Sequence, residues 1–123
     1  MALIFRFMFM LLFLLSSSMA SSVPCKHTYD LQILQWRSGW TGQHVPEYTV
    51  QMINGGSHSL SEIIVNCGTF ASTLFINPNV FKRIGNTNTC MVNGGDLMAP
   101  GKVIRFRYAN ILPFKFTVSS FKC

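Results

Sequence analysis

A chain of 123 residues has room for one small domain, and a hydrophobic fraction of 49% is enough to build a core. Ten Lys and Arg against four Asp and Glu give a formal net charge of +6, which is basic but lacks the clustering expected of a nucleic-acid-binding protein. Four carboxylates also leave few groups for acid–base catalysis.

The first twenty residues have the pattern of a secretory signal peptide. Arg6 precedes a short apolar run, and small residues follow as far as Ala20. A membrane-spanning helix needs about 20 apolar residues, so this shorter run is not expected to be an anchor. We expect cleavage after Ala20 and a single secreted domain over residues 21–123, extracellular and without membrane insertion. Without Arg6, nine Lys and Arg remain against four Asp and Glu, a net charge of +5.

Residues 31–36 form the first predicted strand. Its alternation is imperfect, because Leu31 and Ile33 would share one face and Leu34 and Trp36 the other. Such a strand is either covered on both sides or exposes apolar side chains. We expect Trp36 to belong to the core.

A loop and a hairpin are expected next. The segment 37–46 is rich in Gly and polar residues, with Trp40 in its middle. Residues 47–53 alternate as a half-buried strand does, and 62–67 return after a turn at 54–59, so we expect an antiparallel hairpin. In 47–53, the side chains expected inward are Tyr48, Val50 and Met52, and those expected outward are Glu47, Thr49 and Gln51.

The segment 68–89 is less regular, although 74–76 looks like a short strand. A second hairpin is predicted over 90–109, with an apolar run, a glycine-rich turn and a strand at 102–108. In that last strand, Ile104, Phe106 and Tyr108 are expected to face the core, and Val103, Arg105 and Arg107 to face outwards.

The last predicted strand, 114–118, runs on to Cys123. About seven short strands separated by turn residues, with no segment periodic enough for an amphipathic helix, indicate an all-β fold. We therefore predict a small antiparallel β-sandwich that is stapled by disulfides.

The cysteine count is even, and all four cysteines follow the predicted cleavage site, so two disulfides are expected in an oxidising compartment. Each would contribute about 2–4 kcal/mol to stability. Three connectivities are possible; nested pairing of Cys67 with Cys90 and Cys25 with Cys123 is preferred, because it would pin the irregular segment and both termini. A zinc site is the alternative, but its ligands would be scattered singly rather than in close pairs.

Catalytic signatures are sparse, and we expect no enzyme, no cofactor and no metal site. Glu47 and Glu62 lie on predicted outward faces, which does not favour a carboxylate pair for glycoside hydrolysis. His27, His44 and His58 lie in polar loops without a recognisable catalytic or metal-binding pattern.

Five side chains are candidates for partner binding. Arg105 and Arg107 share an outward face and are able to pair with acidic groups; the alternative is a solvated face that protects a sheet edge. Lys82 and Arg83 have three possible roles: contact with a partner, a dibasic site for proteolytic processing, or a solvated pair of charges without a binding role. Trp40 is a candidate to stack on a sugar or to anchor an interface, if it is exposed.

A series of short motifs in a fixed order covers nearly the whole predicted mature chain. They are Cys25, DLQILQ at 30–35, PEYTVQMIN at 46–54, IIVNCGTF at 63–70, NPNVFKR at 77–83, CMVNGG at 90–95 and FRYAN at 106–110. Together with the cysteine spacing, this series resembles the tapetum-determinant-like proteins of plants.

The resemblance implies a small secreted cysteine-rich ligand that acts in the apoplast on a leucine-rich-repeat receptor kinase and directs cell fate in reproductive tissue such as the anther. One departure concerns the turn after the Tyr-Thr-Val-Gln strand, where members of this family carry two further cysteines and this chain has GGSHSL at 55–60. The resemblance therefore leaves open whether this chain engages the same receptor.

A cell-wall carbohydrate-binding module is the alternative function. The Asn-Gly turn after the Thr-Val-Gln strand and the Phe-Arg-Tyr strand after Pro100-Gly101 are also similar to plant cellulose-binding domains, where exposed aromatic side chains bind polysaccharide. Only Trp40, and Trp36 if it is exposed, are available here for that role.

Overall fold

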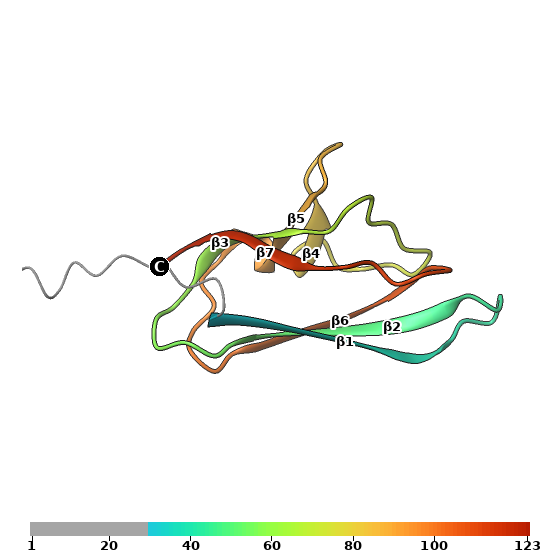
Figure 1. The fold of residues 1–123 in the computed structure, drawn as a ribbon, viewed down its shortest axis with the longest axis horizontal. Coiled ribbons are helices and arrows are strands. Elements are labelled where there is room, and N and C mark those ends of the chain that lie inside the picture. Colours follow the sequence, from blue (N-terminus) through green and yellow to red (C-terminus); the bar gives the residue numbers. More distant parts are fainter. Residues whose placement is uncertain (1–29) are drawn as a thin grey trace, which may run out of the picture.

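Residues 30–123 are described by the structure, a computed structural model; residues 1–29, which include the predicted signal peptide, lie outside the described part. The described residues form seven strands in two antiparallel sheets, which lie face to face as a sandwich (Figure 1). One sheet has the order β1-β2-β6 and the other β4-β5-β3-β7. The strands are β1 (Leu31–Trp40), β2 (Pro46–Asn54), β3 (Ser61–Asn66), β4 (Phe81–Arg83), β5 (Thr89–Val92), β6 (Val103–Ala109) and β7 (Thr117–Lys122). The predicted all-β sandwich is confirmed.

Strand β6 shows the predicted alternation. Ile104, Phe106 and Tyr108 are buried between the sheets, whereas Arg105 and Arg107 are exposed. Successive side chains of a strand point to opposite faces, so one face of β6 supplies the core and the other faces solvent.

Strand β2 departs from the prediction at one position. Val50 and Met52 are fully buried and Tyr48 is half-buried, as expected, but Thr49 on the opposite face is only 5% exposed. Its partners across the sheet are Trp36 on β1 and Arg107 on β6, whose long side chains stand on either side of it. The short threonine side chain is therefore covered from both sides.

Both predicted hairpins are wrong. Strand β2 pairs with β1 and β6, and β3 pairs with β5 and β7 in the other sheet; β5 and β6 also belong to different sheets. A half-buried strand needs cover on one face only. A strand of the opposite sheet provides that cover across the core, so two consecutive strands can both be half-buried without pairing with each other. The alternation identifies the buried face but not the neighbour.

Strand β1 is longer than predicted. It continues to Trp40, with a register shift between Arg37 and Gly39, so that only residues 41–45 connect it to β2. A bulge of this kind absorbs an extra residue and lets pairing continue through the Gly-rich segment. The prediction that Trp36 belongs to the core is wrong, because its side chain lies on the solvent-facing side and is 43% exposed.

The irregular segment contributes the centre of the core. No strand forms at 74–76, and the only strand within 68–88 is the three-residue β4. Phe70, in the connection after β3, is 8% exposed, and aromatic rings from both sheets and the connections surround it. Its ring centroid lies 5.1 Å from that of Phe81, 5.2 Å from Tyr108 and 5.3 Å from Phe114.

The disulfide Cys67–Cys90 is present and both of its residues are fully buried, which confirms this half of the predicted pairing. It joins the end of β3 to β5 within one sheet. Cys25 lies outside the described residues, so its pairing with Cys123 stays a prediction.

A closed ring of hydrogen bonds at one end of the sandwich joins β1 and β6 of the three-stranded sheet to the segment that precedes β7. The Tyr108 hydroxyl on β6 donates to Gln35 Oε1 on β1, the Gln35 amide donates to the Phe114 carbonyl (2.8 Å), and the Phe114 N–H donates to the Tyr108 hydroxyl (2.9 Å). Burial raises the pKa of Tyr108 above its ordinary value, although the Phe114 N–H acts in the opposite direction.

Asn54 organises the opposite end. Its side chain is fully buried and donates to the carbonyls of His58 (2.8 Å) and Met98 (2.9 Å), while the Gly56 N–H donates to its Oδ1 (3.0 Å). This is the turn where the resemblance implies two further cysteines. Leu60, at the end of the turn, is instead a fully buried core residue, so hydrogen bonds and apolar packing hold the turn in this chain.

Candidate interaction surface

The solvent-facing side of the three-stranded sheet combines apolar and cationic side chains, and we call it the outer face. Leu34 and Trp36 on β1 and Val103 on β6 are 51%, 43% and 47% exposed. Of the two interpretations of the imperfect alternation in β1, exposure of its apolar side chains is therefore correct, and burial of both faces of the strand is not. Arg105 and Arg107 of β6 complete the surface. Contiguous exposed apolar groups beside charged ones are typical of interaction sites.

Cross-strand pairing sets the geometry of the outer face. Trp36, Thr49 and Arg107 form one row across β1, β2 and β6, and Leu34, Gln51 and Arg105 form the next. Side chains in one row, and on the diagonal between rows, lie close enough to touch. The apolar end of each row lies on β1 and the cationic end on β6.

The two arginines differ in charge compensation. Arg107 forms an ion pair with Glu47 at 3.2 Å. Arg105 hydrogen-bonds Gln51 Oε1 through Nε at 3.1 Å, and its guanidinium lies 5.9 Å from the centroid of the Trp36 ring, but among residues 30–123 it forms no ion pair. Arg105 Nη2 also donates to Gln51 Oε1, but no carboxylate of the described chain balances the charge of Arg105, which is therefore available to a carboxylate of a partner.

A shallow hollow of about 440 Å³ lies on the outer face. Exposed tryptophan and arginine beside such a hollow are the residue types that anchor protein interfaces. The hollow is lined by Trp36, Ser38, Glu47, Thr49, Arg105, Phe106 and Arg107.

Trp40 lies at the end of β1 and is 61% exposed, but it is not bare. The guanidinium carbon of Arg37 lies 3.7 Å from its ring centroid, a cation–π contact. Trp40 therefore has one ring face covered by Arg37, and Trp36 has Arg105 over one face at a greater distance. The stacking platform required for polysaccharide binding is weak.

Lys82 and Arg83 are not near the arginines of the outer face. They lie on β4, at the edge of the other sheet. Lys82 is exposed, and Arg83 Nε donates to the Thr87 carbonyl at 2.9 Å. The structure thus separates the predicted partner-binding side chains into two groups on different sheets.

The acidic and histidine candidates do not converge. Glu47 pairs with Arg107 on the first sheet, and Glu62 pairs with Lys122 on the second at 2.7 Å. His44 is exposed in the loop between β1 and β2. Within residues 30–123, no three His, Cys, Asp or Glu side chains are grouped to hold a metal ion. In the same part of the chain, no helix has the length and hydrophobicity to cross a bilayer.

Comparison with known proteins identifies relatives. A family model described as Tapetum determinant 1, C-terminal, matches residues 27–123. TPD1 protein homolog 1 of Arabidopsis thaliana is 34% identical over 96 residues, which are 76% of this chain and 53% of the relative. TPD1 protein homolog 1A of Oryza sativa subsp. japonica is 34% identical over 107 residues, 80% of this chain and 47% of the relative. The chain spans about half the length of these curated relatives. No solved structure matches it.

Proposed function

Because the chain belongs to the Tapetum determinant 1 family, we propose that it is a secreted, non-catalytic plant signalling ligand. It acts in the apoplast on the ectodomain of a leucine-rich-repeat receptor kinase and directs cell fate in reproductive tissue such as the anther. Membership of the family supports a ligand role. The disulfide Cys67–Cys90 is consistent with an extracellular site of action.

The outer face is the receptor-binding surface in this proposal. The observation that carries it is Arg105, an exposed cation without an ion pair in the described chain, next to exposed Trp36 and Leu34. Tryptophan and arginine dominate binding energies at protein interfaces, and the apolar side chains around them exclude water. The basic group would meet an acidic patch on the receptor.

Binding of the secreted protein to receptor-kinase ectodomains tests the proposal. Arg105→Glu reverses the unpaired charge and is expected to weaken binding about tenfold or more. Trp36→Ala is expected to have a comparable effect. Lys115→Glu is the matched control, because Lys115 is also exposed and precedes β7 in the other sheet. It changes the net charge by the same amount but should leave binding unchanged.

Two results would contradict this assignment. Equal loss of binding in Arg105→Glu and Lys115→Glu would indicate an effect of net charge and not of the outer face. Unchanged binding in both Arg105→Glu and Trp36→Ala would show that the outer face does not bind the receptor. Thermal melting of each variant shows whether the fold is retained.

A further inference from the structure

Strand β6 is an edge strand, and most of its outer edge is open. At one end, Ala109 is covered: its N–H donates to Ser72 Oγ and its carbonyl accepts from the Thr73 N–H, both at 3.1 Å. The N–H and C=O of one residue point to the same side of a strand, and the side alternates along the chain. The backbone groups of Arg107 and Arg105 therefore point to the same edge as those of Ala109, away from β2.

No other part of the described chain pairs with this edge. Within residues 30–123, strand β6 pairs only with β2. Among residues 30–123, the backbone of Arg105 and Arg107 makes no hydrogen bond across the edge. The open edge is thus a row of unpaired donors and acceptors, which is the template for adding another strand.

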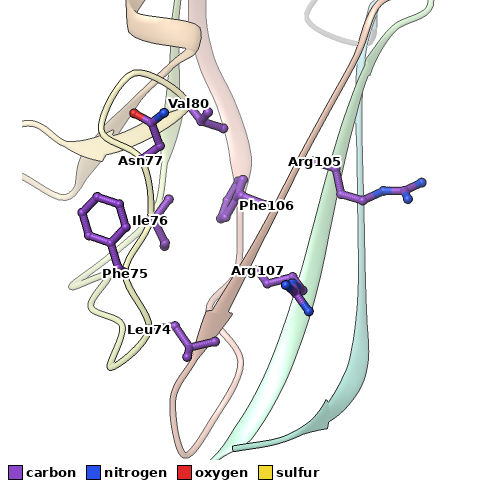
Figure 2. A pocket seen from close by; sticks show the side chains of 8 residues that line it. All are labelled: Leu74, Phe75, Ile76, Asn77, Val80, Arg105, Phe106 and Arg107. Atoms are coloured by element: carbon purple, nitrogen blue, oxygen red, sulfur yellow. The ribbon is translucent and has the colours of Figure 1, made fainter.

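The chain runs beside this edge without closing it. After Thr73 the segment 74–77 diverges from β6 and leaves a hollow of about 320 Å³ between them. Figure 2 shows Ile76 and Phe106 pointing towards this space and Phe75 pointing away from it. Leu74 and Val80 also line the hollow, and Asn77, Arg105 and Arg107 contribute polar groups, so its walls are mixed.

We propose that the open edge of β6 binds an extended acidic segment of a partner polypeptide as an added antiparallel strand. In such a strand the residues opposite Arg105 and Arg107 share their face of the sheet. A carboxylate opposite Arg105 pairs with a guanidinium that has no ion pair in the described chain, and one opposite Arg107 joins the existing pair of Arg107 with Glu47. The residue between them lies opposite Phe106 and points to the side of the hollow that Ile76, Val80 and Phe106 line. The recognised pattern is therefore acidic, apolar, acidic, held by backbone hydrogen bonds.

Charge argues against two other occupants of the edge. A second copy of this chain, paired through its own β6, would bring Arg105 and Arg107 against the same arginines, which is unfavourable. Residues 21–29 of this chain contain Lys26 and no acidic side chain, so they do not complement the edge either.

Binding of an acidic segment at β6 does not depend on the receptor of the proposed function. A capped synthetic peptide with the core Glu-Val-Glu-Val-Glu is the probe. It is titrated into the ¹⁵N-labelled secreted protein, and amide chemical shifts are followed. Shifts are expected at Val103, Arg105 and Arg107 and in the facing segment 74–77, and a Lys-Val-Lys-Val-Lys peptide should produce none.

N-methylated peptides separate strand addition from simple charge attraction. Residues opposite Arg105 and Arg107 exchange backbone bonds with them, so a methyl group on the Glu amide nitrogens blocks pairing. A methyl group on the Val amide nitrogens points away from β6 and leaves the backbone bonds to β6 intact, so it is the matched control. The Glu-methylated peptide should bind about tenfold more weakly than the Val-methylated one. Equal affinities, or shifts that map elsewhere, would overturn the proposal.

Two protein variants provide an independent check. Proline is tolerated where the lost N–H faces away from the sheet, so Arg105→Pro removes an edge donor and leaves the pairing with β2 intact. Arg105→Ala removes the same charge but keeps the N–H. Weaker peptide binding by Arg105→Pro than by Arg105→Ala supports strand addition, and equal binding contradicts it. Because no receptor is present, a failure here leaves the receptor-binding proposal standing, and the reverse also holds.

Discussion

Tyr108→Phe removes one oxygen atom and opens the hydrogen-bonded ring that joins β1 and β6 to the segment before β7. The Phe114 N–H loses its acceptor and Gln35 Oε1 loses its donor, while the aromatic packing of the ring is kept. Leaving part-buried polar groups without partners costs about 1–3 kcal/mol. For a domain of about 100 residues, a loss near 2 kcal/mol lowers Tm by roughly 10 °C.

Tyr48→Phe is the matched control for this loss. Tyr48 stacks on Tyr108 at 5.3 Å between ring centroids, but its hydroxyl makes no hydrogen bond within residues 30–123. In urea unfolding at neutral pH, the free energy of unfolding of Tyr48→Phe should therefore lie within about 0.5 kcal/mol of that of the native protein. The free energy of unfolding of Tyr108→Phe should be well below both. Equal stability of the two variants would refute a structural role for the ring of hydrogen bonds.

The pH dependence gives a second check. Burial, as the largest effect, raises the pKa of Tyr108 above its ordinary value of 10.0 in the folded protein. A group with a raised folded-state pKa stabilises the fold fully below its unfolded-state pKa, and this contribution is lost as the pH rises through the folded-state value. The stability gap between the native protein and Tyr108→Phe should therefore narrow above pH 10. A gap that stays constant there would contradict this account of Tyr108.

Three further variants test the rest of the fold by urea unfolding. Replacing both Cys67 and Cys90 by Ala should cost about 3 kcal/mol, since their separation of 23 residues closes a loop of that size in the unfolded chain; no loss would contradict it. Phe70→Ala should cost about 3–5 kcal/mol because it empties the centre of the aromatic cluster, and a loss below 1 kcal/mol would place Phe70 outside the core. Asn54→Asp sets a carboxylate against two carbonyl oxygens, so it should lower the stability of the fold at neutral pH. The stability should recover as the pH falls and the carboxyl group is protonated. The opposite pH trend would argue against the observed orientation of Asn54.

Local alternation explains which features could be predicted from the sequence. In β6, three apolar side chains alternate with outward ones, and that pattern alone assigned the core face and the exposed arginines correctly. The pairing of strands depends on long-range packing, so β2 and β3 were wrongly joined in a hairpin. Trp36 shows the limit for single residues: a large apolar side chain is usually buried, but its position in the register places it beside Thr49 on the solvent side.

Phe70 shows a different limit. It lies in a connection without regular structure, where no period of two or of 3.6 marks a buried face. Its role follows only from the convergence of rings from β4, β6 and the segment before β7. The open edge of β6 could not be predicted from the sequence either, because a strand is an edge only if no other strand pairs on that side, and this depends on the whole sheet. The arginines there were predicted to face outwards, but their relation to the hollow beside 74–77 depends on the tertiary structure.

The passage of the chain between the sheets has a consequence for how the protein folds. Among the strands of residues 30–123, only β1 with β2 and β4 with β5 are antiparallel neighbours joined by short connections. The chain changes sheet between β2 and β3, between β5 and β6, and between β6 and β7. The two local hairpins are therefore expected to form first, and the remaining pairings must wait for the closure of longer loops. Such topologies fold in about milliseconds to seconds. During that interval the inner faces of the strands are exposed. The Cys67–Cys90 bond makes one of the loops effectively shorter. It would therefore reduce the time in which unpaired strands can associate with other chains.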